Sequence, residues 1–310
     1  PVMAASGLDP STIFPFPLDD FQLEAIDALD QGHSVVVSAP TGSGKTLVGE
    51  YAIHRALAHG QKVFYTTPLK ALSNQKLRDF REAYGDDNVG LMTGDLSVNR
   101  EASIVVMTTE IFRNMLYAEA SEHDDPLADV EAVVLDECHY MNDSQRGTVW
   151  EESIIHCPPS VQLVALSATV ANAGQLTDWI EKVHGPTTLV LSDYRPVPLQ
   201  FSFCSAKGLH PLLNDAGTGL HPNCKVWRAP KGHKRKGRSA KPPQPEPPPI
   251  SFVVAQMAER DMLPAIYFIF SRRGCDKAVR DLGIQCLVNK EEQARIRARL
   301  KAYSRDNPEA

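Results

Sequence analysis

Short apolar runs alternate with longer segments of mixed polarity over the first 200 residues. Several of the short runs are rich in β-branched residues and apolar at nearly every position, which is typical of strands in a parallel sheet buried on both faces. The predicted strands are residues 34–38, 62–67, 104–108, 132–136 and 161–167. Helical patterns lie between them, at residues 46–59, 69–83, 111–118 and 175–184. This alternation predicts an α/β domain built on a doubly wound parallel sheet.

The pattern changes after Val190. Residues 225–249 are basic, then proline-rich, and almost free of aliphatic side chains. Such a segment buries too little apolar surface to offset its ordering entropy, so we interpret it as a disordered linker. Contact of its lysines and arginines with phosphates is the alternative interpretation.

Regular patterns resume after this linker, with a helix expected at residues 250–258, a strand at 265–270 and a helix at 272–282. About 60 residues are too few for a second α/β domain with a core of its own. We therefore expect three parts. They are a first domain at residues 1–200, a connecting segment at 201–249, and the incomplete beginning of a second domain at 250–310.

Composition limits the class of protein. Hydrophobic residues make up 43% of the 310 positions, enough for a sizeable core. The formal net charge of −6 argues against a protein that coats nucleic acid with a basic surface, although it leaves room for a local basic groove. No run of about 18 apolar residues is present, and the first residues lack the pattern of a secretory signal, so we expect no membrane span and no membrane partner.

Six cysteines are scattered along the chain without a C-x-x-C pair. This usage favours reduced thiols in a cytosol-like compartment. A zinc set could be imagined from Cys204, His210, His221, Cys224 and His233. Their spacing fits no standard ligand pattern, so we interpret them as scattered loop residues.

The stretch APTGSGKT, residues 39–46, separates a predicted strand from a predicted helix. Gly42 and Gly44 allow the backbone to turn tightly and direct successive N–H groups at phosphate oxygens, and the following helix adds its positive amino end. Lys45 suits the β- and γ-phosphates, and the Thr46 hydroxyl suits Mg²⁺. A glycine- and serine-rich turn is the plain alternative, which the strand–loop–helix context disfavours.

A second candidate site is the acidic sequence DECH, residues 136–139, at the end of an apolar strand. Ligands of open α/β sheets bind at the carboxyl ends of strands. There Asp136 would hold Mg²⁺ through water, and Glu137 would orient and deprotonate an attacking water. An acidic pair alone is usually a solvated turn, but together with the phosphate loop it indicates hydrolysis of a nucleoside triphosphate.

These motifs, in this order, resemble the superfamily 2 helicases. DECH is similar to the DExH form of motif II, and residues 167–169 (SAT) to motif III. Residues 66–76, 108–110 and 16–26 resemble motif Ia, motif Ib and the adenine-reading segment. Finer detail at 90–95, 136–152 and 194–199 resembles the superkiller group of RNA helicases, which includes helicases that feed the RNA exosome. The resemblance covers roughly residues 10–205 and resumes at 266–278, which is similar to motif IV.

The resemblance implies RecA-like domains, with ATP and Mg²⁺ as the ligands of the first. Phe16 would stack on the adenine, unless it packs in the core, and Gln22 would bond the edge of the base. The phosphate-binding residues would be Ala39, Thr41, Gly42, Ser43, Gly44, Lys45 and Thr46. Ala39 replaces the first glycine of the general pattern, a variation common among helicases.

The resemblance also implies roles in coupling and in nucleic-acid binding. Ser167 and Thr169 would link ATP status to domain movement, with a capped strand end as the alternative, and His139 would bond toward motif III or the second domain. Residues expected along the nucleic-acid backbone are Pro68, Lys70, Asn74, Gly94, Asp95, Thr109 and Arg272. Helix caps or solvated polar groups are the alternative for these positions.

The implied function is an ATP-dependent RNA helicase that moves on single-stranded RNA, in the cytoplasm or a plastid stroma, with an RNA-degradation or RNA-processing complex as partner. Three alternatives stay open: a DNA helicase of the related repair type, a P-loop ATPase without nucleic acid, and a nucleotide-binding module without turnover. The late arginine-rich motif VI of this family is not found in the sequence. We therefore expect the 310-residue chain to bind ATP·Mg²⁺, hydrolyse it slowly and leave RNA unwound.

Overall fold

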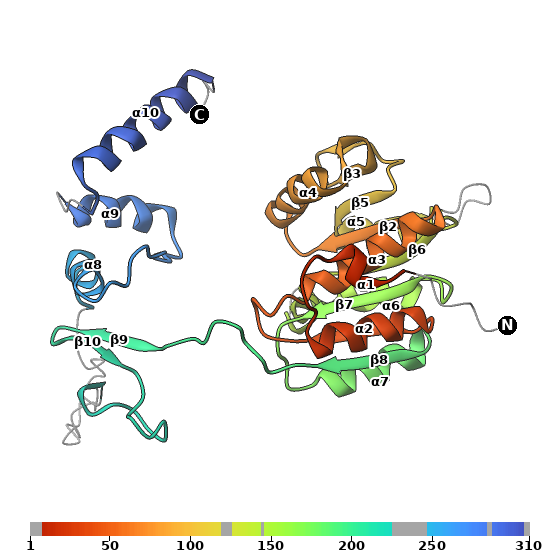
Figure 1. Ribbon diagram of the computed structural model, residues 1–310, viewed down its shortest axis with the longest axis horizontal. Coiled ribbons are helices and arrows are strands. Elements are labelled where there is room, and N and C mark those ends of the chain that lie inside the picture. The colour runs from red at the N-terminus through yellow and green to blue at the C-terminus, as the bar shows by residue number, and fades with distance from the viewer. Residues whose placement is uncertain (1–7, 119–125, 144–145, 225–246, 284–286, 307–310) are drawn as a thin grey trace, which may run out of the picture. The chain divides into compact units, whose positions relative to one another are not determined.

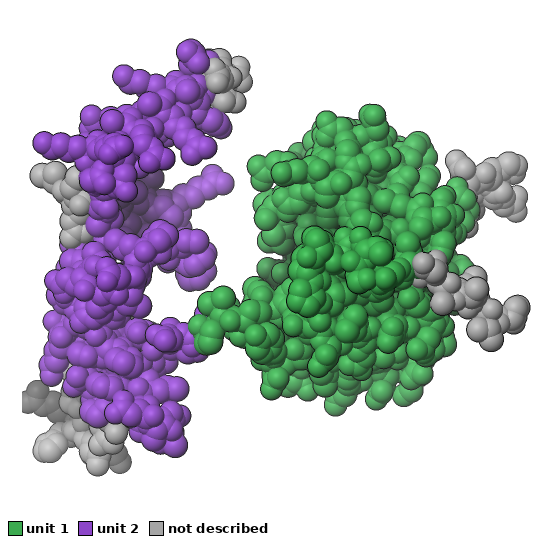
Figure 2. All heavy atoms as spheres, viewed as in Figure 1, with its two compact units in different colours: residues 1–198 green, residues 199–310 purple. Residues whose placement is uncertain are grey.

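The computed structural model describes residues 8–118, 126–143, 146–224, 247–283 and 287–306. The chain separates into two compact units, residues 1–198 and 199–310 (Figure 2). Most of the predicted linker, residues 225–246, lies outside the described residues. No helix within the described ranges combines the length and the apolar character that crossing a membrane requires.

The first unit contains an eight-stranded sheet in the order β4-β3-β5-β2-β6-β7-β1-β8 (Figure 1). Its strands are β1 (Ser34–Ser38), β2 (Lys62–Thr67), β3 (Val89–Met92), β4 (Ser97–Val98), β5 (Ile104–Thr108), β6 (Val130–Leu135), β7 (Gln162–Ser167) and β8 (Thr187–Leu191). All neighbours are parallel except β4, which pairs antiparallel with β3 at the sheet edge. The predicted doubly wound α/β fold is confirmed.

Six longer helices cover the two faces of this sheet. They are α2 (Asp20–Asp30), α3 (Thr46–His59), α4 (Lys70–Tyr84), α5 (Thr109–Ala118), α6 (Gly147–His156) and α7 (Ala173–Val183), preceded by the single turn α1 (Pro10–Ile13). Alternate residues of each strand enter different cores: Val35 and Val37 pack with α2 and α3, whereas Val36 packs with the core that includes α6. The continuous apolar runs in the sequence arise because both faces are covered.

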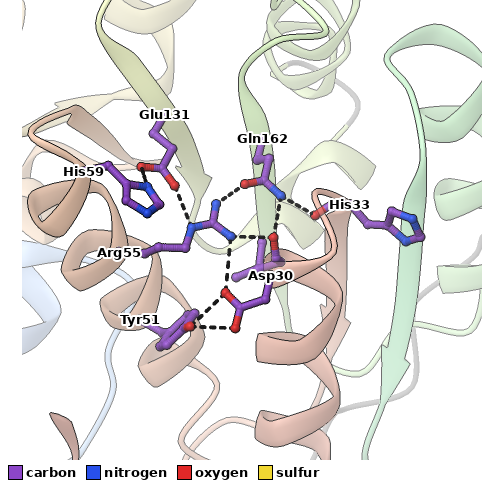
Figure 3. A network of polar contacts seen from close by, with 8 residues as sticks. Asp30, His33, Tyr51, Arg55, His59, Glu131 and Gln162 are labelled. Carbon is purple, nitrogen blue, oxygen red and sulfur yellow. Dashed lines mark hydrogen bonds and ion pairs between the residues drawn. The ribbon is translucent and has the colours of Figure 1, made fainter. Parts of the chain in front are cut away.

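A buried polar network lies at the edge where β6 and β7 begin (Figure 3). The guanidinium of Arg55, only 3% exposed, donates from Nε to Glu131 Oε1 at 2.6 Å and from Nη2 to Gln162 Oε1. Its Nη1 donates to the carbonyl of Leu29 and lies 3.8 Å from Asp30 Oδ1. Asp30 also accepts the hydroxyl of Tyr51 at 2.8 Å, so the network ties α2 and α3 to two strands.

The second unit consists of a hairpin and three helices. The hairpin joins β9 (Ser202–Ser205) and β10 (Gly208–Pro211), and the helices are α8 (Ile250–Ala258), α9 (Arg272–Leu282) and α10 (Lys290–Asp306). The predicted helices at 250–258 and 272–282 are confirmed. The strand predicted at 265–270 is wrong, because this segment has no strand pairing and its Ile266, Phe268 and Phe270 side chains are 82%, 77% and 102% exposed.

The physical reason is that a strand requires a neighbour for its N–H and C=O groups. Within the described part of this unit, β9 and β10 pair only with each other. The apolar character of residues 265–270 is therefore insufficient to form a strand.

Candidate functional site

The sequence-predicted site residues gather along one edge of the large sheet. The strands β5, β2, β6, β7 and β1 are consecutive neighbours, and a motif follows the carboxyl end of each. The register aligns these ends, because Ser38 of β1 pairs with Ser167 of β7 and Thr67 of β2 pairs with Thr108 of β5. Motifs that lie far apart in the sequence thus share one edge.

The phosphate loop connects β1 to α3 in a backbone conformation that favours glycine. Gly42 and Gly44 have φ values of +84° and +85°, in the left-handed region that other residues rarely adopt. Ala39 is fully buried, and its N–H donates to the carbonyl of Ser167 at 3.2 Å. Thr41 is exposed at the tip of the loop and Thr46 is the first residue of α3, so the loop opens onto the amino end of that helix.

Two buried polar side chains of this loop lack a partner among the described residues. Ser43 is 2% exposed, and its hydroxyl makes no hydrogen bond there. Lys45 is 6% exposed, and no ion pair to it exists within the described ranges. An unpartnered buried hydroxyl is costly, so Ser43 indicates a ligand that completes it, and the Lys45 ammonium beside it would add a positive charge. Phosphate oxygens have the charge and acceptor capacity to do so, and the loop therefore fits a nucleoside triphosphate.

The two residues expected to contact adenine differ in whether their side chains are exposed to a ligand. Phe16 is 53% exposed and lies against Phe14 with ring centroids 6.0 Å apart, so it is not a core residue. Gln22 is buried, donates from Nε2 to the carbonyl of Gly44 at 3.0 Å, and accepts the N–H of Asp19 at 2.9 Å. A Cβ at Gly44 would lie 2.8 Å from Gln22 Nε2, so the absence of a side chain there permits this contact with the phosphate loop.

The acidic residues follow β6 directly. Asp136 is 9% exposed, and both of its oxygens are bound: Oδ2 accepts the Tyr65 hydroxyl and Oδ1 accepts the Glu137 N–H, each at 2.9 Å. Glu137 has a φ of +53°, a backbone conformation that costs energy for a residue with a side chain and that clusters at functional sites. The neighbouring Cys138 is not a reactive thiol, because burial raises its pKa to about 12.

Motif III lies beside these acids. The Ser167 side chain is fully buried, and its hydroxyl donates to the carbonyl of Ala168 at 2.8 Å. His139 Nδ1 lies 3.3 Å from Glu137 Oε2 and accepts the N–H of Ala168 at 3.4 Å. The predicted contact of His139 with motif III is thus present. Thr169 is exposed and lines a cleft that also includes Ser38 and Asp19.

The residues expected along the nucleic-acid track lie around the amino ends of α4 and α5. Lys70 begins α4 and forms an ion pair with Asp95, and Asn74 is exposed one turn later. Thr109 begins α5, but its side chain is fully buried and its hydroxyl donates to Thr67 O at 3.3 Å. Only the backbone of Thr109 is left for a phosphate, as at other helix amino ends.

The remaining track residues differ in exposure. Gly94 is exposed, whereas Pro68 is buried and its carbonyl accepts Arg146 Nη2 at 2.8 Å. Arg272 is exposed at the start of α9 and belongs to the second unit.

Two residues with direct contacts to the site were not identified from the sequence. Tyr65 lies inside an apolar strand, and its hydroxyl requires a hydrogen-bond partner when it is buried. A tyrosine at such a position is a sequence signal that could have identified it. Arg146 lies in the RGTVWEE segment and bonds both Pro68 and Glu110, linking the starts of α4 and α5. Its partners are distant in the sequence, so only the fold reveals the link.

The zinc site considered for the cysteines and histidines between Cys204 and His233 is not formed within the described ranges. No group of three or more histidine, cysteine or acidic side chains there could hold a metal. His233 lies outside those ranges. The five described cysteines, Cys138, Cys157, Cys204, Cys224 and Cys275, are free thiols.

Comparison with known families matches residues 19–176 to the DEAD/DEAH box helicase model, which is just over half of the chain. The chain belongs to the DEAD/DEAH box helicase family. A DExH-box ATP-dependent RNA helicase of Arabidopsis thaliana chloroplasts, DExH15, is 43% identical over 96% of this chain and 29% of that protein. The probable helicase HelY of Mycobacterium tuberculosis H37Rv is 45% identical over 91% of the chain and 32% of that protein.

Further similarities agree with this family. The human exosome RNA helicase MTR4 is 44% identical over 85% of the chain and 25% of that protein. Among solved structures, the helicase MrfA bound to DNA superposes with a TM-score of 0.50 at 21% identity, covering 62% of this chain and 30% of that one, which supports the RecA-like fold alone. The chain spans about a third or less of the length of these curated relatives.

Proposed function

We propose that this chain forms the ATP-binding and hydrolysing part of an ATP-dependent RNA helicase. The observation that carries the proposal is the pairing of two kinds of group along one sheet edge. Within the described residues, the buried Ser43 hydroxyl has no hydrogen bond and the mostly buried Lys45 has no ion pair, and Asp136 and Glu137 follow the strand two places away from β1. The first pair suits phosphate oxygens, and the second suits a metal ion and a water molecule.

The roles of the residues follow from their chemistry. Lys45 and the N–H groups of the phosphate loop bind the β- and γ-phosphates, and Phe16 offers its exposed ring to the base. Thr46 and Asp136 are the residues that would hold Mg²⁺, which when bound offsets charge on the phosphates. Glu137 orients the attacking water and accepts its proton on a carboxylate oxygen.

RNA is the proposed nucleic acid. The similar plant and human proteins are named RNA helicases, and the human one is named an exosome RNA helicase, which supports an RNA-degradation or RNA-processing complex as partner. Lys70, Asn74 and the amino ends of α4 and α5 offer groups suited to phosphates rather than to base edges. We therefore propose weak sequence preference and marked salt dependence, with activity in the cytoplasm or a plastid stroma.

The decisive experiment measures steady-state ATP hydrolysis by the complete protein without nucleic acid, with single-stranded RNA, and with DNA of the same sequence. Stimulation by RNA well above that by DNA is expected. Equal or greater stimulation by DNA would favour a DNA helicase, and no stimulation by either would favour an ATPase that does not act on nucleic acid.

The 310-residue chain itself is proposed to bind ATP·Mg²⁺ and hydrolyse it slowly. Arginines of a late motif supply about 10³–10⁵ in rate in related phosphoryl-transfer enzymes, and the sequence at hand shows no such motif. A turnover of about 1 s⁻¹ by this chain is the low end for ordinary enzymes. Such a rate would contradict the proposal if the turnover also depended on Glu137.

A further inference from the structure

Tyr65 lies in β2 with its side chain fully buried, and its hydroxyl donates to Asp136 Oδ2 at 2.9 Å. The other carboxylate oxygen, Oδ1, accepts the N–H of Glu137 at 2.9 Å. With one donor on each oxygen, the carboxylate is fixed in rotation. Each oxygen of an ionised carboxylate can accept a second hydrogen bond, so the anchored group still has free lone pairs for water around a metal ion.

The ring of Tyr65 is fixed from both neighbouring helices. Phe80 of α4 meets it edge-on with centroids 5.0 Å apart, and the ammonium of Lys76 lies 5.2 Å from its centroid. On α3, a Cβ at Gly49 would lie 3.3 Å from Tyr65 Cε2, so the helix packs closely against the ring. These contacts hold the ring in the position from which its hydroxyl bonds Asp136.

The Tyr65 hydroxyl is the one side-chain donor to the Asp136 carboxylate among the described residues, because the other bond to that carboxylate comes from the backbone N–H of Glu137.

We propose that Tyr65 is a positioning residue for the Mg²⁺ site, holding the Asp136 carboxylate in the orientation that binds the hydrated metal ion. The proposal rests on the proposed function, because it assigns Tyr65 to the same nucleotide site. Hydrogen bonds to metal-binding side chains fix their orientation and basicity, and their loss typically weakens metal affinity about 10–100-fold.

The chain offers a matched control. Tyr51 is also fully buried, and its hydroxyl donates to Asp30 Oδ1 at 2.8 Å, but this pair belongs to the network at the opposite edge of the sheet (Figure 3). Tyr65→Phe and Tyr51→Phe therefore each remove the hydroxyl of a fully buried tyrosine that donates to an aspartate, at 2.9 Å to Asp136 and at 2.8 and 2.9 Å to the two oxygens of the partly exposed Asp30. They differ in whether the aspartate lies at the nucleotide site.

The experiment titrates Mg²⁺ into the 310-residue chain at a fixed concentration of a fluorescent ATP analogue and measures the Mg²⁺ concentration at half-maximal nucleotide binding. Tyr65→Phe should raise this concentration about tenfold, whereas Tyr51→Phe should leave it at the wild-type value. Equal values in all three proteins would overturn the proposal. A wild-type chain whose nucleotide binding is absent or indifferent to Mg²⁺ would instead contradict the proposed function.

A second measurement keeps the hydroxyl and covers the case in which Tyr65→Phe fails to fold. The chain is prepared with 3-fluorotyrosine at position 65 or at position 51, and ¹⁹F spectra are recorded with the ATP analogue before and after Mg²⁺ is added. The signal at position 65 should shift with Mg²⁺, while the signal at position 51 should stay unchanged. An unchanged signal at position 65 would contradict the assignment.

Discussion

At the edge of the sheet where the strands begin, every nitrogen of the buried Arg55 guanidinium donates a hydrogen bond (Figure 3). At the edge where the strands end, the mostly buried Lys45 has no ion pair and the buried Ser43 hydroxyl has no hydrogen bond within the described residues. Both edges belong to the same sheet and bury charge to nearly the same extent, since Arg55 is 3% and Lys45 is 6% exposed.

The difference shows where the fold has satisfied its own polar groups and where it has not. A fully paired buried charge joins elements together, and removal of one partner is costly. An unpaired buried charge lowers stability unless a ligand completes it. The contrast therefore distinguishes a structural network from the proposed binding site without reference to any motif. Four experiments test this contrast.

The largest effect is expected from Glu137→Gln in the complete protein. The amide cannot accept the proton of the attacking water, so turnover should fall about 10²–10⁴-fold, equivalent to about 3–5 kcal/mol of barrier. Nucleotide affinity should be retained, because Glu137 does not bind the phosphates. The measurement is ATP turnover together with equilibrium nucleotide binding. Near-normal turnover would show that Glu137 is not the base.

The second effect concerns the opposite edge. Arg55→Met should lower the free energy of unfolding by about 3–5 kcal/mol, because Glu131 and Asp30 lose the cation between them. Urea unfolding measures this change, and nucleotide affinity of the folded protein should stay unchanged. Lys62→Met is the control, because its ion pair with the 88% exposed Glu101 side chain is solvated and is expected to contribute only about 0–1 kcal/mol. Loss of nucleotide binding in folded Arg55→Met would mean that the two edges are not independent.

Lys45→Met should have the reverse effect on stability. Replacing a mostly buried lysine that has no ion pair within the described residues should raise the free energy of unfolding without ligand by about 1 kcal/mol, the low end for a polar group that keeps some contact with water, while ATP binding is lost. Urea unfolding with and without ATP·Mg²⁺ separates the two outcomes. A variant less stable than the wild type in the absence of ligand would indicate that the fold itself depends on Lys45.

The smallest effect is expected from His54, which lies on α3 between the two edges. Burial lowers the pKa of His54, so the unfolded chain takes up a proton at a higher pH than the folded chain does. Its contribution to stability is thus present above about pH 6.5 and is lost as the pH falls through the lowered folded pKa. Unfolding measured at pH 7.5 and 5.0 should show a smaller decrease for His54→Gln than for the wild type. Identical decreases would exclude this contribution.

Local patterns were sufficient for elements whose ends carry their own signals. The helix predicted at 46–59 is observed with those bounds, because the phosphate loop precedes it and Gly60, with a φ of +70°, ends it. The strand predicted at 132–136 is observed as β6, Val130–Leu135, so Asp136 lies just beyond the carboxyl end of the strand, where ligands of open α/β sheets bind. For the same reason, the sequence placed the proposed phosphate loop before α3 and the acidic residues after β6, where the structure has them.

Contacts between distant residues could not be predicted in this way. Tyr65 and Asp136 are 71 positions apart, and Arg55 and Gln162 are 107 apart, so nothing local indicates either pair. For the segment at 265–270, the local sequence predicted an element that the structure does not have. Its composition favours a strand, but strand formation depends on a partner, and the described residues of the second unit provide none for it.

The Nδ1 atom of His139 lies between a hydrogen-bond acceptor and a hydrogen-bond donor. His139 Nδ1 lies 3.3 Å from a carboxylate oxygen of Glu137 and 3.4 Å from the N–H of Ala168. A ring nitrogen that carries a proton can donate to Glu137 but must repel the Ala168 N–H, and one that lacks a proton does the reverse. The two contacts are mutually exclusive, so the tautomer of His139 decides whether its Nδ1 is hydrogen-bonded to the Glu137 carboxylate or to the Ala168 N–H.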